Sequence, residues 1–564
     1  MEKRIFLAVV ISIAILALWG AVIPKLFPQF AKKEPPAQTQ KNVKTTPAAA
    51  TTTTATTTAT TSEAPASGGP ALPGPSSPSL PPPAKAGAPS APVAAIAESQ
   101  TIVDRDDFTA RFTNRGGELV SFRLKHYRAK DGSPLELVKA REAERSDFPF
   151  AIVTREARLE QHLNTALYAL TERTEKNVRV LEYRYSDGAT SVVKTFRVGS
   201  EYQFDFAVSV TPPIPYRIEI GPGIRTLAPE ERDSQFIITG NGAAEINDKL
   251  KVIPREKADR ISVITDPDFV AVEDNYFLTA LRPTRSGDGT IRRFDVRLDA
   301  KQTRRDLYAG LNTASDGTIA GKAFFGPKQT KVLETYGYAS TLQFGFFGFI
   351  GRLLLELLIW MNGFIHNYGW SIIALTIIIK IVLYPLQHKS IVSMKRMQRV
   401  QPKVEAIRNR YKKSRSDAEQ RQKMNTEMMK LYQQEGINPM GGCLPIALQL
   451  PILWGFYGLL SRAIELRGAP FMWWIHDLSA KDPYYITPIL MTITMFIQQS
   501  VTPTTVDPAQ RRMFLIMPLV FGWIFKEFPS GLVLYWLVQN VLTIVQQLIM
   551  NKYWKDHPAE LSKD

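Results

Sequence analysis

The chain has 564 residues, of which 45% are hydrophobic, and its 69 basic side chains outnumber 53 acidic ones, which gives a formal charge of +16. This length is enough for two or three domains. The single cysteine, Cys443, excludes a disulfide scaffold and any zinc or iron–sulfur site built from several cysteines. The excess basic charge suits nucleic acid, anionic lipid or the ribosome as a partner, and its distribution along the chain discriminates between them.

An apolar run follows the short charged N-terminus. Ile5 to Ile23 is long enough to span a bilayer as a helix, and the lysine and arginine before it favour a cytoplasmic N-terminus. A cleaved signal peptide is the alternative, but Trp19 occupies a position before a cut after Ala21 that normally needs a small residue. We therefore predict that residues 1–24 form an uncleaved transmembrane signal anchor.

Residues 25–99 are low in complexity and rich in Ala, Thr and Pro. Such a composition cannot bury a hydrophobic core. We predict an extended linker whose contribution is reach.

Residues 100–335 contain short runs in which apolar and polar residues alternate. The clearest run is Tyr202–Val210, and another, Phe108–Phe112, leads into a turn at Asn114–Gly117. A period of two, bounded by Gly, Pro, Asn and Asp, is typical of antiparallel strands. The sequence therefore predicts an all-β sandwich domain, which follows the anchor and is expected on the far side of the membrane.

Beyond residue 340 the sequence becomes apolar and helical. Within residues 340–361, Arg352 and Glu356 lie four positions apart, which predicts an amphipathic helix at the membrane interface. A core of five spanning helices is expected within residues 362–550. The five predicted spans are 362–386, 443–463, 484–501, 513–528 and 530–550.

Basic residues concentrate between the first and second of these spans. Residues 388–435 hold thirteen basic and five acidic side chains. The positive-inside rule places this segment, the loop 502–512 and the tail 551–564 in the cytoplasm with the N-terminus. The excess charge therefore indicates topology, with ribosome or lipid contact as a further option, rather than a general nucleic-acid surface.

Lys380 lies within the apolar segment Ile372–Pro385 of the first predicted core span. A lysine at the centre of a membrane helix costs ~2.5–3.5 kcal/mol, so it should face protein or water. Snorkelling of its long side chain to the headgroups is the alternative. Two further observations favour a buried polar site. Helical spacing places Thr376, Lys380, Tyr384 and Gln387 on one face, and other spans carry the polar residues Gln449, Thr492, Thr494, Gln498, Asn540 and Thr543.

The basic segment 388–435 has the pattern of two helices separated near Lys412–Arg415. Methionines recur on one face of each helix. The interpretation without a substrate-binding role is a solvated basic hairpin beside anionic lipid. The functional alternative is docking of a hydrophobic nascent segment on the adaptable methionines, or of ribosomal RNA on the basic side.

Enzyme signatures are weak. Gly317–Ala323 superficially resembles a phosphate-binding loop, but it is one residue short and lacks Ser or Thr after Lys322. The six histidines are scattered, with no His-Glu-x-x-His pattern, and no nucleophile elbow is present. We expect no catalytic residues, no metal, no nucleotide and no cofactor.

Several segments together resemble the YidC/Oxa-type membrane protein insertases. The segments are Thr376–Pro385, the hairpin residues Met394, Gln401–Lys403 and Glu427–Met429, the motif Asn438–Pro445 with Gln449–Ile452, and Phe528–Trp536. The similarity covers about residues 340–550, and the anchor, linker and β-domain resemble the Gram-negative YidC arrangement more loosely. The resemblance implies an inner-membrane insertase and chaperone for nascent membrane proteins, working alone or with the Sec translocon. Its β-domain would be periplasmic and both termini cytoplasmic.

The resemblance also implies a groove, open to cytoplasm and lipid, with a central cation. That cation is usually Arg and here is Lys380, which keeps the charge but not the bidentate guanidinium. A substrate-contacting position of the last span is commonly Tyr, and Trp536 departs from that pattern. The groove candidates are Lys380, Thr376, Tyr384, Gln449, Tyr535 and Trp536, and the hairpin candidates for substrate or ribosome contact are Met394, Met397, Arg399, Met424 and Met428.

Two other classes of function are alternatives to the insertase. A polytopic small-solute transporter with a periplasmic binding domain often shows internal repeats, and none is visible among these spans. A membrane-tethered sugar-binding enzyme would need a carboxylate pair, and the sequence singles none out within residues 100–335.

Overall fold

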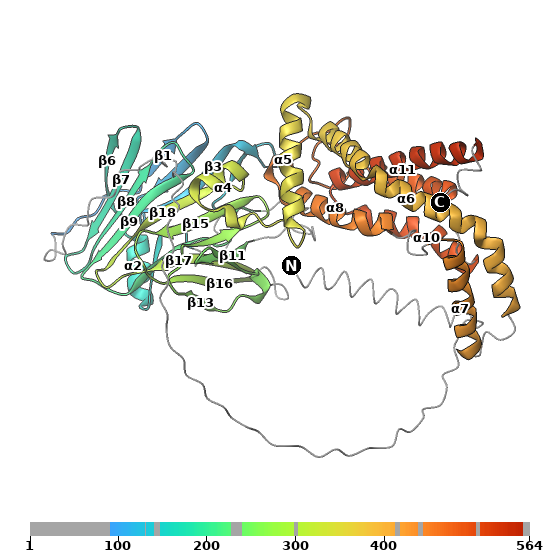
Figure 1. Ribbon diagram of the computed structural model, residues 1–564. Coiled ribbons are helices and arrows are strands. Elements are labelled where there is room, and N and C mark those ends of the chain that lie inside the picture. Colours follow the sequence, from blue (N-terminus) through green and yellow to red (C-terminus); the bar gives the residue numbers. More distant parts are fainter. Residues whose placement is uncertain are drawn as a thin grey trace, which may run out of the picture. The chain divides into compact units, whose positions relative to one another are not determined.

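The computed structural model describes residues 91–129, 131–139, 147–226, 240–297, 303–411, 418–437, 444–502 and 508–556 (Figure 1). Strands occupy the first part of this range and helices the second. The predicted anchor, most of the predicted linker and the segment Asn438–Cys443 of the family motif lie outside the described residues.

The β-domain consists of antiparallel strands, and the described strands form sheets of nine, five and four. The nine-stranded sheet has the order β12-β11-β14-β15-β18-β9-β8-β7-β6, the five-stranded sheet β13-β16-β17-β10-β5, and the four-stranded sheet β1-β2-β3-β4. The strands are β1 Gln100–Asp104, β2 Phe108–Thr113, β3 Glu118–Arg128, β4 Pro134–Glu136, β5 Ala151–Thr154, β6 Ala169–Glu175, β7 Val178–Ser186, β8 Ser191–Val198, β9 Gln203–Thr211, β10 Tyr216–Ile220, β11 Asn241–Ile246, β12 Lys249–Ile253, β13 Ile261–Ile264, β14 Phe269–Glu273, β15 Phe277–Pro283, β16 Gly289–Arg297, β17 Thr303–Asn312 and β18 Thr318–Pro327.

Aromatic side chains join these sheets into a sandwich core. Phe122 of β3 stacks on Phe325 of β18 with 5.3 Å between ring centroids, and Phe150 beside β5 lies 5.2 Å from Phe206 of β9. The alternation predicted for β9 is present, because Phe204 and its alternate neighbours are buried while the residues between them are not. The predicted β-sandwich is therefore confirmed, with its hydrophobic core built from the inward positions of each strand.

Backbone hydrogen bonds to the β-domain begin before β1, at Val93. Val93 and Ser186 exchange backbone hydrogen bonds of 2.9 and 2.8 Å, and the Ala95 amide donates to Leu167 at 2.9 Å. Residues from Val93 onward, at the end of the predicted linker, are thus held against strands of the domain.

The turn between β2 and β3 contains two glycines in the left-handed region, Gly116 at φ 68° and Gly117 at φ 60°. A Cβ at Gly116 would approach the Asn164 carbonyl oxygen to 2.7 Å. The turn predicted from Asn114–Gly117 therefore needs glycine for both conformation and space. It brings β2 and β3 into register beside the short helix α2 (Ala157–Thr165), which carries Asn164.

The helical part confirms the expected run of apolar helices. Its long helices are α5 Gly348–Ile365, α6 Tyr368–Arg410, α7 Ala418–Gln434, α8 Leu444–Leu460, α9 Ile486–Val501, α10 Pro508–Phe525 and α11 Ser530–Asp556, and the shorter α4 covers Thr330–Tyr336. Within the described residues, α5, α6 and α11 are long and apolar enough to cross a membrane, whereas α8, α9 and α10 contain shorter apolar helices. The number of five core spans therefore stays a prediction.

Helix α6 is longer than any predicted element. The first predicted core span and the first helix of the predicted hairpin are one continuous helix of 43 residues, with Pro385 and Pro402 inside it. Each proline removes one hydrogen bond to the carbonyl four residues earlier, while the other backbone hydrogen bonds of the helix continue past it, and the helix formers Gln387, Lys389 and Met394 follow Pro385. The membrane segment and the basic segment are thus covalently and structurally continuous.

Helix α5 covers most of the segment predicted to lie at the interface. Its buried residues, among them Leu354 and Leu358, recur at a spacing of three to four. Its exposed face combines Arg352 and Glu356 with Trp360, which is 63% exposed. The length permits a span and the charged pair favours the interface, so the interfacial position stays a prediction.

Candidate functional site

Lys380 is a residue of α6, and its side chain contacts α11. Its side chain is 9% exposed, and Nζ donates a hydrogen bond of 2.9 Å to Oγ1 of Thr543. The Thr543 hydroxyl in turn donates to the Gln539 carbonyl at 2.7 Å. Among the residues that the structure describes, no carboxylate forms an ion pair with Lys380. A buried ammonium is therefore held by a neutral hydroxyl, which leaves most of its charge available to another group.

The other residues predicted to share the face of Lys380 divide into two groups. Thr376 is fully buried and donates to the Ile372 carbonyl at 2.7 Å, and Gln387 is 7% exposed. Tyr384 is 46% exposed and lies against His388, with 5.8 Å between ring centroids. Helical geometry explains the division. Each step of four residues rotates a side chain by about 40°, so two steps carry Tyr384 off the stripe while Gln387 returns to it.

A row of buried polar residues on α11 continues the site. Gln539, Asn540, Gln546 and Gln547 are all at most 9% exposed. Asn540 joins α11 to α9 by donating to Thr494 Oγ1 at 3.2 Å. Asn540 and Thr543 were predicted as internal polar residues, whereas the three glutamines were not. Their signal is the spacing of four and three residues from Gln539 through Thr543 to Gln546, which keeps them on one helical face.

Several polar atoms of this row have no hydrogen-bond partner within the described part of the chain. They are Oε1 of Gln539 and both Oε1 and Nε2 of Gln546, and all three are buried. A buried polar atom without a partner costs about 1–3 kcal/mol, so such atoms normally meet water or a ligand. Together with Lys380 they form what we call the polar strip, defined as Thr376, Lys380, Gln539, Thr543 and Gln546.

The aromatic candidates lie nearer the N-terminal end of α11. Tyr535 is 1% exposed, stacks on Phe456 of α8 at 4.3 Å, and directs its hydroxyl toward the side chain of Gln449. Trp536 instead packs on Phe525 of α10, with 5.4 Å between centroids. Tyr535 and Thr543 are eight residues apart, or about 12 Å along a helix. The six groove candidates therefore do not form one cluster: Thr376 and Lys380 lie on α6, Tyr535 contacts Gln449, and Trp536 and Tyr384 each have other neighbours.

The hairpin methionines are partly used for internal packing. Met397 of α6 and Met428 of α7 pack against a small buried cluster that contains Val400 and Val404. Ion pairs Lys403–Glu435 and Arg410–Glu427, each with 2.5 Å between nitrogen and oxygen, join the two helices. Met394 and Met424 are half-buried, and Arg399 is exposed. The most exposed methionine of the described hairpin is Met429 at 47%, which the candidate set omitted.

Comparison with known proteins matches almost the whole chain. The family described as "60Kd inner membrane protein" matches residues 360–557, and the family described as "YidC periplasmic domain" matches residues 100–357. A protein of Geotalea daltonii named "Membrane protein insertase YidC" is 34% identical, over 98% of this chain and 99% of its own length. The protein of the same name from Geobacter metallireducens is 35% identical, over 98% of each chain.

Solved structures of similar proteins were also found. A crystal structure of an active YidC insertase with its first transmembrane domain resolved is 18% identical, covers 81% of this chain and 94% of that chain, and has a TM-score of 0.35. YidC from Thermotoga maritima is 13% identical, with 81% and 99% covered and a TM-score of 0.29.

Proposed function

Because the chain belongs to the YidC family of membrane protein insertases, we propose that it inserts nascent membrane proteins along the polar strip on α6 and α11. The chain is an inner-membrane insertase with a periplasmic β-domain, and its family is not an enzyme family. Its substrates as a class are nascent membrane proteins. The comparisons give no support to the alternative of a small-solute transporter.

The observation that carries this proposal is the neutral partner of Lys380. A polar segment that crosses hydrocarbon leaves its backbone and side-chain polar groups unpaired, at several kcal/mol each. Within the described residues the Lys380 ammonium is hydrogen-bonded to Thr543 and to no carboxylate, so it can attract an acidic residue of that segment without first breaking an ion pair. Lys380 would act as an electrostatic attractor for the outer segment of the substrate.

The second element of the proposal is the set of buried amide atoms without a partner in the described part of the chain, which are Oε1 of Gln539 and both Oε1 and Nε2 of Gln546. Amide oxygens and nitrogens can hydrogen-bond water or an extended backbone in either polarity. Lying on the same helix face as Thr543, they would keep the path beside Lys380 polar over about two helical turns. A polar segment would then exchange water for amide contacts instead of entering hydrocarbon unpaired.

Release into the bilayer needs no hydrolysis. Helix α9 presents Ile493 and Ile497 outward, at 48% and 45% exposure, and α10 presents Leu519 at 59%. A substrate helix that leaves the polar strip beside such surfaces gains ~0.3–0.6 kcal/mol for each large apolar residue transferred to lipid. Summed over a spanning helix, that gain drives the final step.

The remaining assignments belong to the same proposal. Both termini and the segment 388–435 would be cytoplasmic, with domain limits as predicted from the sequence. The segment 388–435 would receive the substrate or the ribosome through Met394, Met397, Arg399, Met424 and Met428, and the Sec translocon would assist some substrates. The half-buried methionines support contact with an apolar segment, because a short rearrangement exposes their flexible side chains.

The test is insertion of a single-span substrate with an acidic outer segment into vesicles that contain the full-length protein. Lys380→Ala should slow insertion by about tenfold, Lys380→Glu should slow it further, and Lys380→Arg should retain it. A substrate whose outer segment is neutral should respond much less. The exposed hairpin variant Lys423→Ala is the matched control. Equal insertion of acidic and neutral substrates by the Lys380→Glu variant would remove the electrostatic role.

A further inference from the structure

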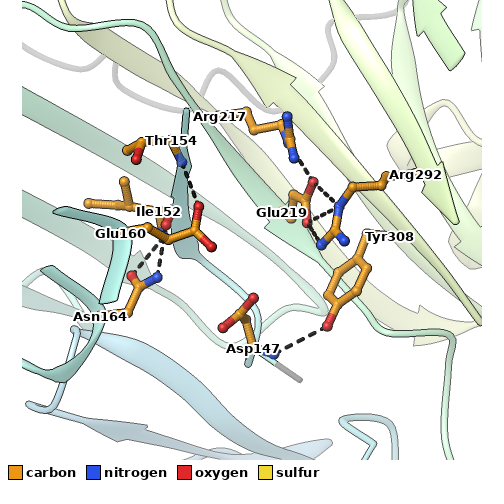
Figure 2. A network of polar contacts seen from close by, with 9 residues as sticks. All are labelled: Asp147, Ile152, Thr154, Glu160, Asn164, Arg217, Glu219, Arg292 and Tyr308. Carbon is orange, nitrogen blue, oxygen red and sulfur yellow. Dashed lines mark hydrogen bonds and ion pairs between the residues drawn. The ribbon is translucent and has the colours of Figure 1, made fainter. Parts of the chain in front are cut away.

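The two edges of the five-stranded sheet are treated differently. At the β5 edge, side chains of helix α2 occupy the place of a further strand (Figure 2). Asn164 accepts from the Ile152 amide at 2.9 Å and donates to the Ile152 carbonyl at 2.8 Å, while Glu160 accepts from the Thr154 amide at 2.9 Å. The outward backbone groups of β5 are therefore capped and cannot pair with another chain.

The strand next to β5, β10, is paired on both sides and carries a buried charge network. Glu219 of β10 is 1% exposed and receives hydrogen bonds from Arg217 at 2.6 Å and from Arg292 of β16 at 2.8 Å (Figure 2). The Arg292 guanidinium also lies over the Tyr308 ring at 4.3 Å. This network links side chains of β10, β16 and β17 on one face of the sheet.

The described edges of the other sheets are also guarded. Strand β6 carries Glu172, Arg173 and Glu175, and β12 carries Lys249 and Lys251. In β1, Nη1 of Arg179 donates to the Ile102 carbonyl at 2.6 Å, and β4 is three residues long and begins with Pro134. Charges, prolines and side-chain caps are the devices by which proteins prevent unwanted strand pairing.

Strand β13 lacks these devices. Ile261–Ile264 contains no charge, proline or glycine, and it pairs with β16 on one side. Ile261 is 46% exposed and Val263 59%, both on the face that carries Arg292. Within the described residues, no side chain or further strand is hydrogen-bonded to the outer edge of β13. An open edge flanked by β-branched side chains is a template for strand addition.

We propose that the β13 edge receives an extended segment of the polypeptide under insertion, which adds as a transient strand. A four-residue strand is about 13 Å long and offers few backbone hydrogen bonds. The area it can bury is far below the roughly 1,200–2,000 Å² of a stable protein interface, which argues against a lasting dimer through this edge. An unfolded chain, by contrast, brings free backbone groups and needs only a brief contact. Only the identity of the occupant rests on the proposed function.

The chemistry of the contact follows from its geometry. Backbone pairing tolerates many sequences, while Ile261 and Val263 favour apolar or β-branched residues at every second position of the added strand. Proline would be disfavoured because it lacks the amide donor. The segment recognised is thus extended, proline-free and apolar at alternate positions.

The chain permits a clean disulfide test, since Cys443 is its only cysteine. The full-length Val263→Cys variant is prepared in a Cys443→Ser background and placed in vesicles. It is oxidised while it inserts a substrate. A series of substrates is used, each with one cysteine at a different position of the translocated segment. Crosslinking should peak at every second substrate position, because strand side chains alternate. The matched control is Ile102→Cys, because Ile102 is 56% exposed on an edge strand and its own backbone carbonyl accepts a hydrogen bond from Arg179. It should crosslink about tenfold less.

A second variant tests the edge itself. Lysine introduced by Val263→Lys should lower crosslinking from an Ile261→Cys reporter about tenfold, because a charge on the edge blocks strand pairing. Protease protection of the substrate is measured in the same vesicles. A substrate that inserts with crosslinks at every position alike, or with none above the Ile102→Cys control, overturns the β13 proposal and leaves the proposed function intact. A disulfide between two Val263→Cys chains in its place would identify a second copy as the occupant and equally overturn it.

Discussion

The β-domain and the helical core both bury cations, but they compensate them differently. In the β-domain Arg225 and Asp274 are each 1% exposed and lie 2.5 Å apart, and Lys328 lies 2.9 Å from Glu273. In the core, Lys380 meets a threonine hydroxyl. Removing the acidic partner of a buried cation destabilises the fold, whereas a buried cation with a neutral partner can attract an acidic group without first breaking an ion pair. The contrast distinguishes Arg225 and Lys328, which have acidic partners, from Lys380 and from Lys194, whose ammonium donates to a backbone carbonyl.

The largest effect is expected from Asp274→Ala in the β-domain. The substitution removes the carboxylate that pairs with buried Arg225 and the acceptor of the Tyr276 and Phe277 amides. The free energy of unfolding should fall by about 3–5 kcal/mol, measured by thermal unfolding of the full chain in detergent. Asp316→Ala breaks the exposed pair with Arg285 and should change it by less than about 1 kcal/mol. Equal effects of the two variants would contradict the distinction between buried and exposed pairs.

Methionine replacements of two buried lysines test the comparison directly. Lys328→Met should destabilise the β-domain by about 3–5 kcal/mol, because Glu273 stays buried without its cation. Lys380→Met should leave stability equal or higher, since no carboxylate is stranded, and should reduce insertion of an acidic substrate. Unfolding and insertion are measured on the same preparations. Strong destabilisation by Lys380→Met would show that the core cation is structural after all.

The pH dependence of β-domain stability sharpens the comparison at Lys194. Burial lowers the pKa of Lys194 to about 8, and Nζ donates to the Phe150 carbonyl at 2.7 Å. Above pH 8 the folded chain releases this proton while the unfolded chain keeps it, so stability should rise by about 2 kcal/mol toward pH 10. Beyond pH 10 stability should fall, because burial raises the pKa of Tyr183 to about 12. Lys194→Met should abolish the rise in unfolding measurements across this range, and a rise that persists would assign it to another group.

The smallest effect is expected from the partner of Lys380. Thr543→Val removes the hydroxyl that holds the ammonium but keeps the shape of the side chain. Loss of one hydrogen bond of about 1 kcal/mol should slow insertion of an acidic substrate about fivefold. Thr543→Ser should restore the rate. A defect that serine does not rescue, or that appears equally with a neutral substrate, would point to packing instead of positioning.

The sequence predicted individual elements better than the relations between them. Alternation identified β9, and apolar runs identified the helices of the core, because both patterns depend on near neighbours in the chain. The continuity of α6 through Pro385 was missed, since a proline is a local stop signal that neighbouring turns can override. Local pattern therefore determines what each segment is, and tertiary packing determines where it ends.

The candidate site divides in the same way. Lys380 and Thr543 were each noted in the sequence, but their hydrogen bond depends on how α11 is rotated against α6, which no local pattern encodes. Gln539 and Gln546 were missed because glutamine in a helix is usually a solvated residue. The open edge of β13 was also invisible, because it depends on strand order and on Asn164 capping the opposite edge.

The length of α6 has a mechanical consequence. Thirty residues separate Lys380 from the end of the helix at Arg410, which is about 45 Å of continuous helix, more than the thickness of a bilayer core. Lys380 lies within this helix, and the basic residues Arg408 and Arg410 lie in its last turn. A tilt of only about 5° imposed at Arg410 displaces that end by about 4 Å relative to Lys380, a distance comparable to the Lys380–Thr543 hydrogen bond itself. The basic end of α6 and the buried ammonium therefore belong to one helix, with Pro385 and Pro402 between them.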